Sequence, residues 1–256
     1  MKKLLMLVMC VIMAIAMAGC GGSATKEKAP EKVLKVATDA NFPPFEYYVK
    51  DAHTHTGFDI ELMKAVAKQM GYDKVEFKNI HFNDILKALN EKQVDAAIAA
   101  ISITDERKKL VDFSDSYLET GLRIVVNTKS EGGEGIGVIK GKKVAVEEGS
   151  IGVAAAKKYG AADVITAAST EEAIKMVAHE IADCAIANET VESFFITNGY
   201  GDEVKFAGKQ LTIDHLGIAV VKGNKELLDK MNAALSEVER SGVYKKIYTS
   251  YFGKPE

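Results

Sequence analysis

Three consecutive segments decide the fold: Val33-Leu34-Lys35-Val36-Ala37-Thr38, then residues 57–70 (GFDIELMKAVAKQM), then residues 75–80 (VEFKNI). The first and third segments are short and rich in apolar or β-branched residues, which is typical of strands. The middle segment repeats apolar residues at helical spacing and stops at Gly71, so it predicts an amphipathic helix. Strand, helix and strand in this order predict a βαβ unit with parallel strands.

The same alternation continues along the chain and starts again after the Gly-rich stretch 130–141, which we interpret as a boundary. Two α/β lobes of similar size follow from these two series. Ligands of such sheets bind at the carboxyl ends of the strands, and a cleft between lobes is the expected pocket. Further strands are predicted at 96–102, 122–127, 143–146, 163–166, 184–187 and 216–221, and further helices at 82–91, 150–159, 169–179, 189–198, 225–240 and 244–251.

Composition narrows the class of protein. Of 256 residues, 47% are hydrophobic and 27% charged, which is ordinary for a folded chain and excludes disorder. The formal net charge of −3 offers no basic excess for nucleic-acid backbones. The chain has three cysteines, too few for a disulfide scaffold, and Cys184 is expected to be a small buried residue.

The N-terminus has the pattern of a secretory signal peptide. A positive start is followed by the apolar run Leu4–Met17 and then by Ala18-Gly19-Cys20. This tail resembles the bacterial lipobox. The resemblance implies a signal peptide of residues 1–19, acylation of Cys20 (with palmitate among its acyl chains) and a tether at 20–32. The alternative is an uncleaved membrane anchor, for which the apolar run is short.

Four motifs together resemble one known family. They are residues 37–46 (ATDANFPPFE), 57–62 (GFDIEL), 101–107 (ISITDER) and 111–117 (VDFSDSY). In this order and spacing they resemble the polar amino-acid-binding proteins of ATP-driven uptake systems, which include glutamine, histidine and lysine/arginine/ornithine binders. The resemblance covers about 33–253.

The resemblance implies an α/β, two-lobed periplasmic-binding-protein fold of type II. The first lobe would comprise residues 33–120 and 221–253, and the second residues 127–213. Two crossings, at 121–126 and 214–220, would form the hinge. The ligand would be captured by closure of the lobes, which excludes water and completes the contacts.

The implied function is a solute-binding lipoprotein on the extracytoplasmic face of the cell membrane. Its partners would be a small amino acid, an ABC permease and the ATPase subunits, and it would act as a monomer without a cofactor, metal or catalytic residue. One alternative is a cyclohexadienyl dehydratase on the same fold, which would need a general acid in the cleft. Another is a ligand-sensing module.

The resemblance also implies site residues. Arg107 corresponds to the clamp on the ligand α-carboxylate, which suits the planar fork of a guanidinium. Ala100 and Ser102 correspond to polar contacts with the amino-acid core. Ser150 and Ile151 lie where a strand meets a helix N-terminus, and such a turn offers N–H groups to the same carboxylate.

Phe42 and Phe82 correspond to aromatic residues that flank the ligand side chain, although either is also an ordinary core residue. Asp39 matches a pocket acid of the family. Glu147 departs from the Lys that glutamine binders carry at this position. If Asp39 and Glu147 converge, they favour a cation between them, and we therefore expect a basic ligand, arginine first. The alternatives are that Glu147 faces solvent, or that the ligand is glutamine or another neutral amino acid.

Asn188 is a second departure, because the family usually has Asp there to pair with the ligand α-ammonium. An amide oxygen accepts a hydrogen bond but carries no charge. Either the ammonium is bound more weakly, or Glu189 compensates, or the ligand is not a standard α-amino acid. A separate pair of side chains, His53 and His55, is expected to lie at a polar hairpin tip rather than in a metal site.

Overall fold

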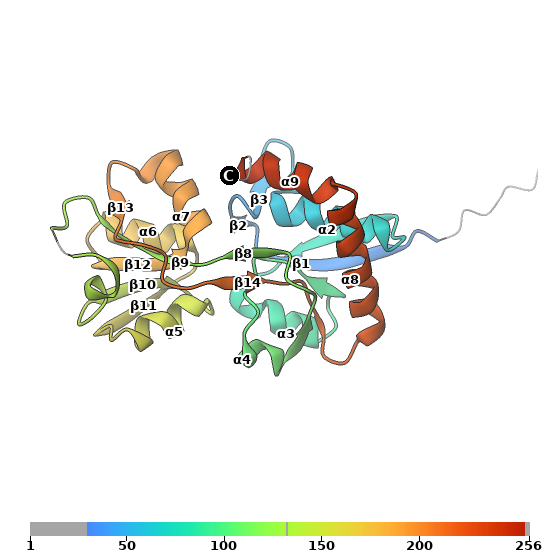
Figure 1. Ribbon diagram of the computed structural model, residues 1–256, viewed down its shortest axis with the longest axis horizontal. Coiled ribbons are helices and arrows are strands. Elements are labelled where there is room, and N and C mark those ends of the chain that lie inside the picture. Colours follow the sequence, from blue (N-terminus) through green and yellow to red (C-terminus); the bar gives the residue numbers. More distant parts are fainter. Residues whose placement is uncertain (1–29, 132, 254–256) are drawn as a thin grey trace, which may run out of the picture. The chain divides into compact units, whose positions relative to one another are not determined.

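The computed structural model describes residues 30–131 and 133–253, and residues from Lys32 onward form one compact unit. The expected signal peptide, Cys20 and most of the expected tether lie outside the described residues. Two five-stranded sheets organise this unit, and the expected two-lobed α/β fold is confirmed. We call the parts built on them the first and the second lobe (Figure 1).

The first lobe has the strand order β5-β1-β6-β15-β7. Strands β5, β1 and β6 are parallel, whereas β15 is antiparallel to both β6 and β7. Around this sheet lie α2, α3, α4, α8 and α9. The elements are β1 Val33–Thr38, α2 Phe58–Gln69, β5 Lys74–Asn79, α3 Ile85–Asn90, β6 Ala96–Ala97, α4 Asp105–Lys108, β7 Val111–Phe113, β15 Ala219–Val221, α8 Lys225–Arg240 and α9 Val243–Phe252.

The second lobe repeats this plan with the order β11-β10-β12-β9-β13. Here β11, β10 and β12 are parallel, and β9 is antiparallel to β12 and β13. Its elements are β9 Leu122–Asn127, β10 Lys143–Glu147, α5 Ile151–Lys158, β11 Asp163–Ala167, α6 Thr170–Ala178, β12 Cys184–Asn188, α7 Glu189–Phe195 and β13 Val204–Phe206.

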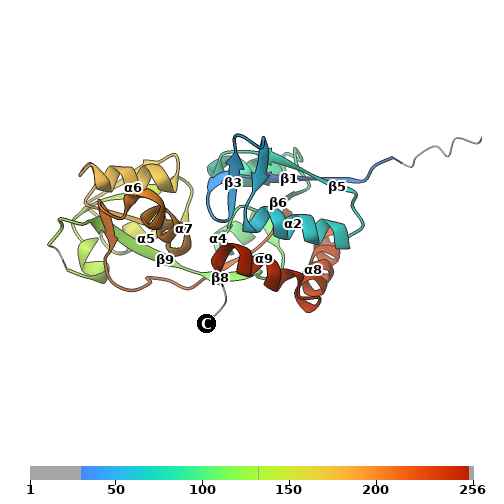
Figure 2. The same ribbon diagram turned by 90° about the horizontal axis from the view of Figure 1, so that it is seen from above.

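The strands of the βαβ units are parallel as predicted, but each sheet also contains an antiparallel strand that was not predicted. The antiparallel strand is β15 in the first lobe and β9 in the second. Each of them directly follows the segment in which the chain crosses over from the other lobe. The two crossing segments also pair with each other. Strands β8 (Leu118–Thr120) and β14 (Asp214–Leu216) form a two-stranded antiparallel ribbon between the lobes (Figures 1 and 2). The first crossing was expected at 121–126, but residues 122–127 are β9, a member of the second sheet.

Two predicted strands are also shorter than expected. The segment 96–102 forms a strand only at Ala96–Ala97 and then bends, with Ala100 at a φ of 45° and a single bridge from Ser102 to Leu216. The segment 216–221 divides into β14 and β15 on either side of Gly217, because its two ends join different sheets. Sequence analysis also missed a small sheet of β2 (Asn41–Phe42), β3 (Glu46–Val49) and β4 (Thr54–Thr56).

The hairpin β3–β4 contains the His53 and His55 pair as a polar hairpin, although His55 lies in β4 rather than at the tip. Within the described part of the chain, no group of three or more metal-binding side chains occurs. Nor is any helix of that part long and apolar enough to cross a membrane.

Aromatic side chains tie the C-terminal helix α9 to the first lobe. Phe58 of α2 lies 4.8 Å from Phe252 and 6.2 Å from Tyr117 between ring centroids. Gly57 precedes α2 at a φ of 128°, and a Cβ there would lie 2.1 Å from the carbonyl oxygen of Phe45. Only glycine fits this close approach, which explains part of the 57–62 motif.

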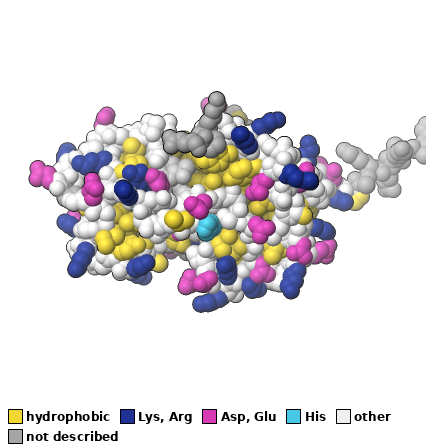
Figure 3. All heavy atoms as spheres, in the orientation of Figure 1, with side chains coloured by type: hydrophobic (Ala, Val, Ile, Leu, Met, Phe, Trp, Pro, Cys, Tyr) yellow, Lys and Arg dark blue, Asp and Glu magenta, His cyan; other side chains and the backbone are white. Residues whose placement is uncertain are grey.

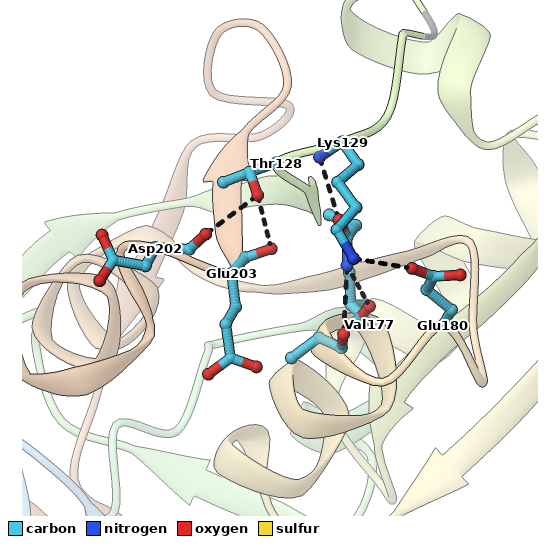
Figure 4. Close-up of polar contacts among 8 residues, drawn as sticks. Thr128, Lys129, Val177, Glu180, Asp202 and Glu203 are labelled. Carbon is cyan, nitrogen blue, oxygen red and sulfur yellow. Dashed lines mark hydrogen bonds and ion pairs between the residues drawn. The ribbon is translucent and has the colours of Figure 1, made fainter.

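Residues that follow β9 make side-chain contacts with other segments of the second lobe (Figure 4). Thr128 Oγ1 donates to the carbonyls of Asp202 and Glu203 at 3.0 and 3.3 Å, and Lys129 forms an exposed ion pair with Glu180 at 3.5 Å.

Cys184 is buried as expected, and burial raises the pKa of its thiol to about 12. On the face shown in Figure 3, acidic and basic side chains are interspersed among hydrophobic ones.

Candidate functional site

One pocket collects residues from both lobes, which is a common location for a small-molecule site. Its walls come from the carboxyl ends of β1, β6, β10 and β12, as expected for open α/β sheets. All ten residues named from the sequence line it: Asp39, Phe42, Phe82, Ala100, Ser102, Arg107, Glu147, Ser150, Ile151 and Asn188. Sequence analysis missed six more: Glu46, Ala99, Leu122, Thr170, Ala187 and Asp214.

Arg107 spans the two lobes. It lies in α4, whose first turn is capped by the side chain of Thr104. Its Nη1 donates to the Ser102 carbonyl at 2.9 Å, and its Nη2 donates to the Gly149 carbonyl of the second lobe at 3.1 Å. The guanidinium also lies 5.3 Å from the ring centroid of Phe82. These contacts leave a positioned cation with further N–H donors at the pocket.

Burial lowers the pKa of Arg107 to about 10, and the charge of Asp214 opposes that shift. The guanidinium therefore stays charged at neutral pH. Among the described residues that line the pocket, Arg107 alone is basic. The pocket thus presents one fixed cation to an anionic group.

Three carboxyl groups gather elsewhere in the pocket: Asp39, Glu46 and Glu147 are 5%, 1% and 4% exposed. Asp39 Oδ2 accepts the Phe82 N–H at 2.8 Å. Glu147 Oε2 accepts the Thr170 hydroxyl at 2.7 Å, so the alternative in which Glu147 faces solvent is wrong. Glu46 Oε2 has no hydrogen-bond partner among the described residues.

These three groups repel one another's charge. Burial raises the pKa of Glu147 to about 7, and the Asp39 carboxylate adds to that shift. Burial also raises the pKa of Asp39. For Glu46, burial raises the pKa well above its ordinary value, with further contributions from Asp59, Asp39 and Glu147. Such a cluster is relieved by a cation placed among its members.

Ala100 is held in its bent conformation by Asp59, a residue of the 57–62 motif. Asp59 is fully buried in α2, and its Oδ2 accepts the Ala100 N–H at 2.7 Å and the Tyr117 hydroxyl at 2.8 Å. These bonds fix the backbone just before Ser102. Asp59 therefore shapes the pocket without lining it.

The turn after β10 supplies the pocket with a helix N-terminus. Ser150 is the N-cap of α5 and Ile151 its first residue. The first N–H groups of a helix have no partner within it, and they favour an anion. The Ser150 hydroxyl oxygen is buried without a partner among the described residues. Both aromatic residues, Phe42 and Phe82, are half-buried at the pocket.

Asn188 ends β12 and caps α7. Its Oδ1 accepts the Thr190 N–H at 2.9 Å, and its Nδ2 donates to the Thr120 hydroxyl at 3.2 Å. Glu189 is paired with Arg123 at 2.6 Å and does not line this pocket. The alternative in which Glu189 compensates for Asn188 has no support in this structure, because the Glu189 carboxylate is paired with Arg123 and lies outside the pocket lining.

The pocket residues that sequence analysis missed were not equally predictable from the sequence. Glu46 is the last residue of the motif 37–46, so its presence in the same pocket as Asp39 could have been predicted from the sequence. Thr170 was expected only at the start of a helix and Asp214 only at the start of the second crossing, and the structure places them at the start of α6 and of β14.

Comparison with known proteins agrees with this geometry. The family model of the bacterial extracellular solute-binding proteins, family 3, matches residues 34–254. The chain belongs to this family. Solute-binding proteins of the family include the arginine-binding extracellular protein ArtP of Bacillus subtilis, which is 34% identical over 98% of this chain and 98% of its own length.

Solved structures of family members superpose well on this solute-binding protein. An ancestral arginine-binding protein has been solved bound to arginine and bound to glutamine, and each structure matches with a TM-score of 0.82 and 39% identity. The match to the arginine complex covers 87% of this chain and 99% of that chain. The ancestral amino-acid-binding protein AncCDT-1, a precursor of cyclohexadienyl dehydratase, matches with a TM-score of 0.78 and 34% identity over 86% of this chain and 95% of its own.

Proposed function

We propose that this solute-binding protein is the capture component of an amino-acid ABC uptake system and that its ligand is a basic amino acid, with arginine the first candidate. The observation that carries the ligand class is the set Asp39, Glu46 and Glu147, three buried carboxyl groups. A guanidinium among them relieves their repulsion and supplies donors to their free oxygens. The arginine-binding relatives are consistent with this choice.

The two ends of the pocket would bind different parts of the ligand. Arg107 and the N–H groups at the start of α5, near Ile151, would hold the ligand α-carboxylate. The ligand side chain would pass between Phe42 and Phe82 toward the three acids. A guanidinium stacks well on aromatic faces, which favours arginine over lysine in this position.

Capture would proceed by closure of the lobes about β8 and β14, with the hinge in that ribbon. This proposed hinge lies close to the expected one, because the expected crossing 121–126 borders the ribbon and the expected crossing 214–220 overlaps it. The expected lobes, 33–120 with 221–253 and 127–213, are refined accordingly. A two-stranded ribbon bends with few lost contacts, whereas the sheets on either side are rigid.

The test is a thermal-shift panel on the chain that starts after Cys20, with all common amino acids, ornithine, citrulline and cystine. A ligand that binds only the native state at a hundredfold excess over its Kd stabilises it by about 2.7 kcal/mol. Shifts from arginine, lysine or ornithine alone support the proposal. A shift from glutamine or another neutral amino acid instead overturns the ligand class.

We further propose that Cys20 carries a lipid that anchors the protein outside the cytoplasm. The support is the sequence pattern at 17–20. A Cys20→Ala protein should leave the membrane fraction, and its retention there at the wild-type level would contradict the anchor.

A dehydratase activity is the second candidate, since the Glu147 carboxyl, with a pKa of about 7, suits a general acid at neutral pH. The readout is phenylpyruvate formed from prephenate by the purified protein. Its formation, abolished by Glu147→Gln, would establish this candidate.

A further inference from the structure

The carboxyl groups of the pocket fall into two sets. Asp39, Glu46 and Glu147 act on one another, as described above. Asp214 stands apart, because it is the acid whose charge acts on Arg107. Asp214 also differs in origin, because it lies in β14 of the ribbon between the lobes, whereas the other three acids lie in or directly after β1, β3 and β10.

The β8–β14 ribbon sets the position of Asp214. Asp214 is in register with Thr120 of β8, and Leu216, two residues on, bridges to Ser102. Thr120 is in turn hydrogen-bonded to Asn188. Asp214, Asn188 and Ser102 are thus linked through one ribbon, and Arg107 Nη1 donates to the Ser102 carbonyl at 2.9 Å.

Asp214 has an oxygen available to a ligand. Its Oδ2 accepts the Thr212 hydroxyl at 2.7 Å, whereas its Oδ1 has no hydrogen bond from any described residue. The side chain is half-buried and lines the pocket. Asn188, by contrast, uses its Oδ1 to cap α7 and carries no charge.

We propose that Asp214 receives the α-ammonium of the ligand and so replaces the charge that Asn188 lacks. The inference rests on the proposed capture of an α-amino acid. Since the α-ammonium and the α-carboxylate are attached to one carbon, the ammonium acceptor must lie beside the carboxylate clamp Arg107. Asp214 meets this condition, and it reaches the site from the hinge ribbon rather than from β12.

The experiment compares L-arginine with 5-guanidinopentanoate, which keeps the carboxylate and the guanidinium but lacks the ammonium. Calorimetry should show that Asp214→Asn weakens arginine binding by about ten- to a hundredfold, the range for a hydrogen bond to a charged group. Binding of 5-guanidinopentanoate should change less than twofold. Adding Asn188→Asp to Asp214→Asn should restore much of the arginine affinity, and Asp229→Asn, an exposed change in α8, is the matched control.

Equal losses for both ligands, or no loss for arginine, would overturn the role of Asp214. If the wild-type protein binds glutamine but not arginine, the proposed ligand falls, and the same comparison between glutamine and its deaminated analogue, glutaramate, decides the role of Asp214. If the wild type binds none of these ligands, both proposals fall.

Discussion

Arg107 and Gly149 are joined across the two lobes: Nη2 of Arg107 donates to the Gly149 carbonyl at 3.1 Å. A second contact lies beside it, in which Asn83 Nδ2 of the first lobe donates to Glu148 Oε1 at 3.3 Å. The same guanidinium that we assign to the ligand carboxylate therefore also links the lobes. We therefore expect ligand binding and closure to be coupled through this one side chain.

Arg107→Lys tests this coupling. Lysine keeps the charge but lacks the planar fork that donates to Ser102 and Gly149 at once. We expect ligand affinity to fall about tenfold or more, measured by calorimetry. The control is Arg240→Lys, which changes an exposed ion pair with Glu237 in α8 and should leave affinity unchanged. Wild-type affinity in Arg107→Lys would contradict the clamp.

Gly149→Ala should prevent full closure. A Cβ at Gly149 would lie 2.7 Å from Asn83 Oδ1 and 3.2 Å from Asn83 Cα, in the other lobe. We expect weaker ligand binding and a smaller ligand-induced decrease in the radius of gyration, measured by small-angle X-ray scattering.

The matched control is Gly160→Ala. Gly160 has a φ of 82°, close to the 73° of Gly149, but its Cβ would meet only Lys140 Cγ at 3.7 Å. Both variants should lose about 1 kcal/mol of stability from the left-handed backbone, and only Gly149→Ala should lose closure. Equal scattering changes in the two variants would count against an effect at the interface.

Glu147 should make stability and binding depend on pH. Burial and the nearby Asp39 carboxylate raise the pKa of Glu147 from 4.5 to about 7, while His81 and the Thr170 hydroxyl oppose the shift. Between these values the folded protein binds more protons than the unfolded chain, so stability without ligand should fall as pH rises from about 4.5 to 7. Above pH 7, Glu147→Gln should be more stable than wild type by about 1–3 kcal/mol in urea unfolding.

A cationic ligand favours the ionised carboxylate, so arginine affinity should rise between pH 6 and 8. Binding at pH 7 should release protons, which calorimetry in buffers of different ionisation enthalpy detects. Asp163→Asn, an exposed change in β11, should retain the wild-type pH profile. A flat profile in the wild type would argue against a cation at Glu147.

Asp59→Ala should destabilise the first lobe at its centre. It leaves the Ala100 N–H and the Tyr117 hydroxyl without their buried acceptor, at a cost of about 1–3 kcal/mol for each group. Urea unfolding should show this loss, and ligand affinity should fall as Ala100 relaxes. Asp73→Ala removes one exposed acceptor, that of the Lys32 N–H, and should cost under about 1 kcal/mol. Similar losses in both variants would refute the special role of Asp59.

Local sequence patterns predicted much of the fold. The strands Val33–Thr38 and Leu122–Asn127 and the helix Lys225–Arg240 have the predicted bounds, because their apolar spacing and end signals are local. The short strands β2, β3 and β14 escaped notice, since two to four residues carry no measurable periodicity. The direction of β9 and β15 was also beyond reach, because it depends on which strand of which sheet each one joins.

The sequence by itself determined the family, the two α/β lobes and ten residues that share a pocket, because these residues lie in motifs or at predicted strand ends. The tertiary structure alone decided how the charges of that pocket are grouped. Glu46 reaches the pocket of Asp39 and Glu147 because β3 folds back on β2, and Asp214 reaches the pocket of Arg107 because β14 pairs with β8. Such groupings arise from contacts between residues distant in sequence, and electrostatic energy depends on distance in space rather than on position along the chain.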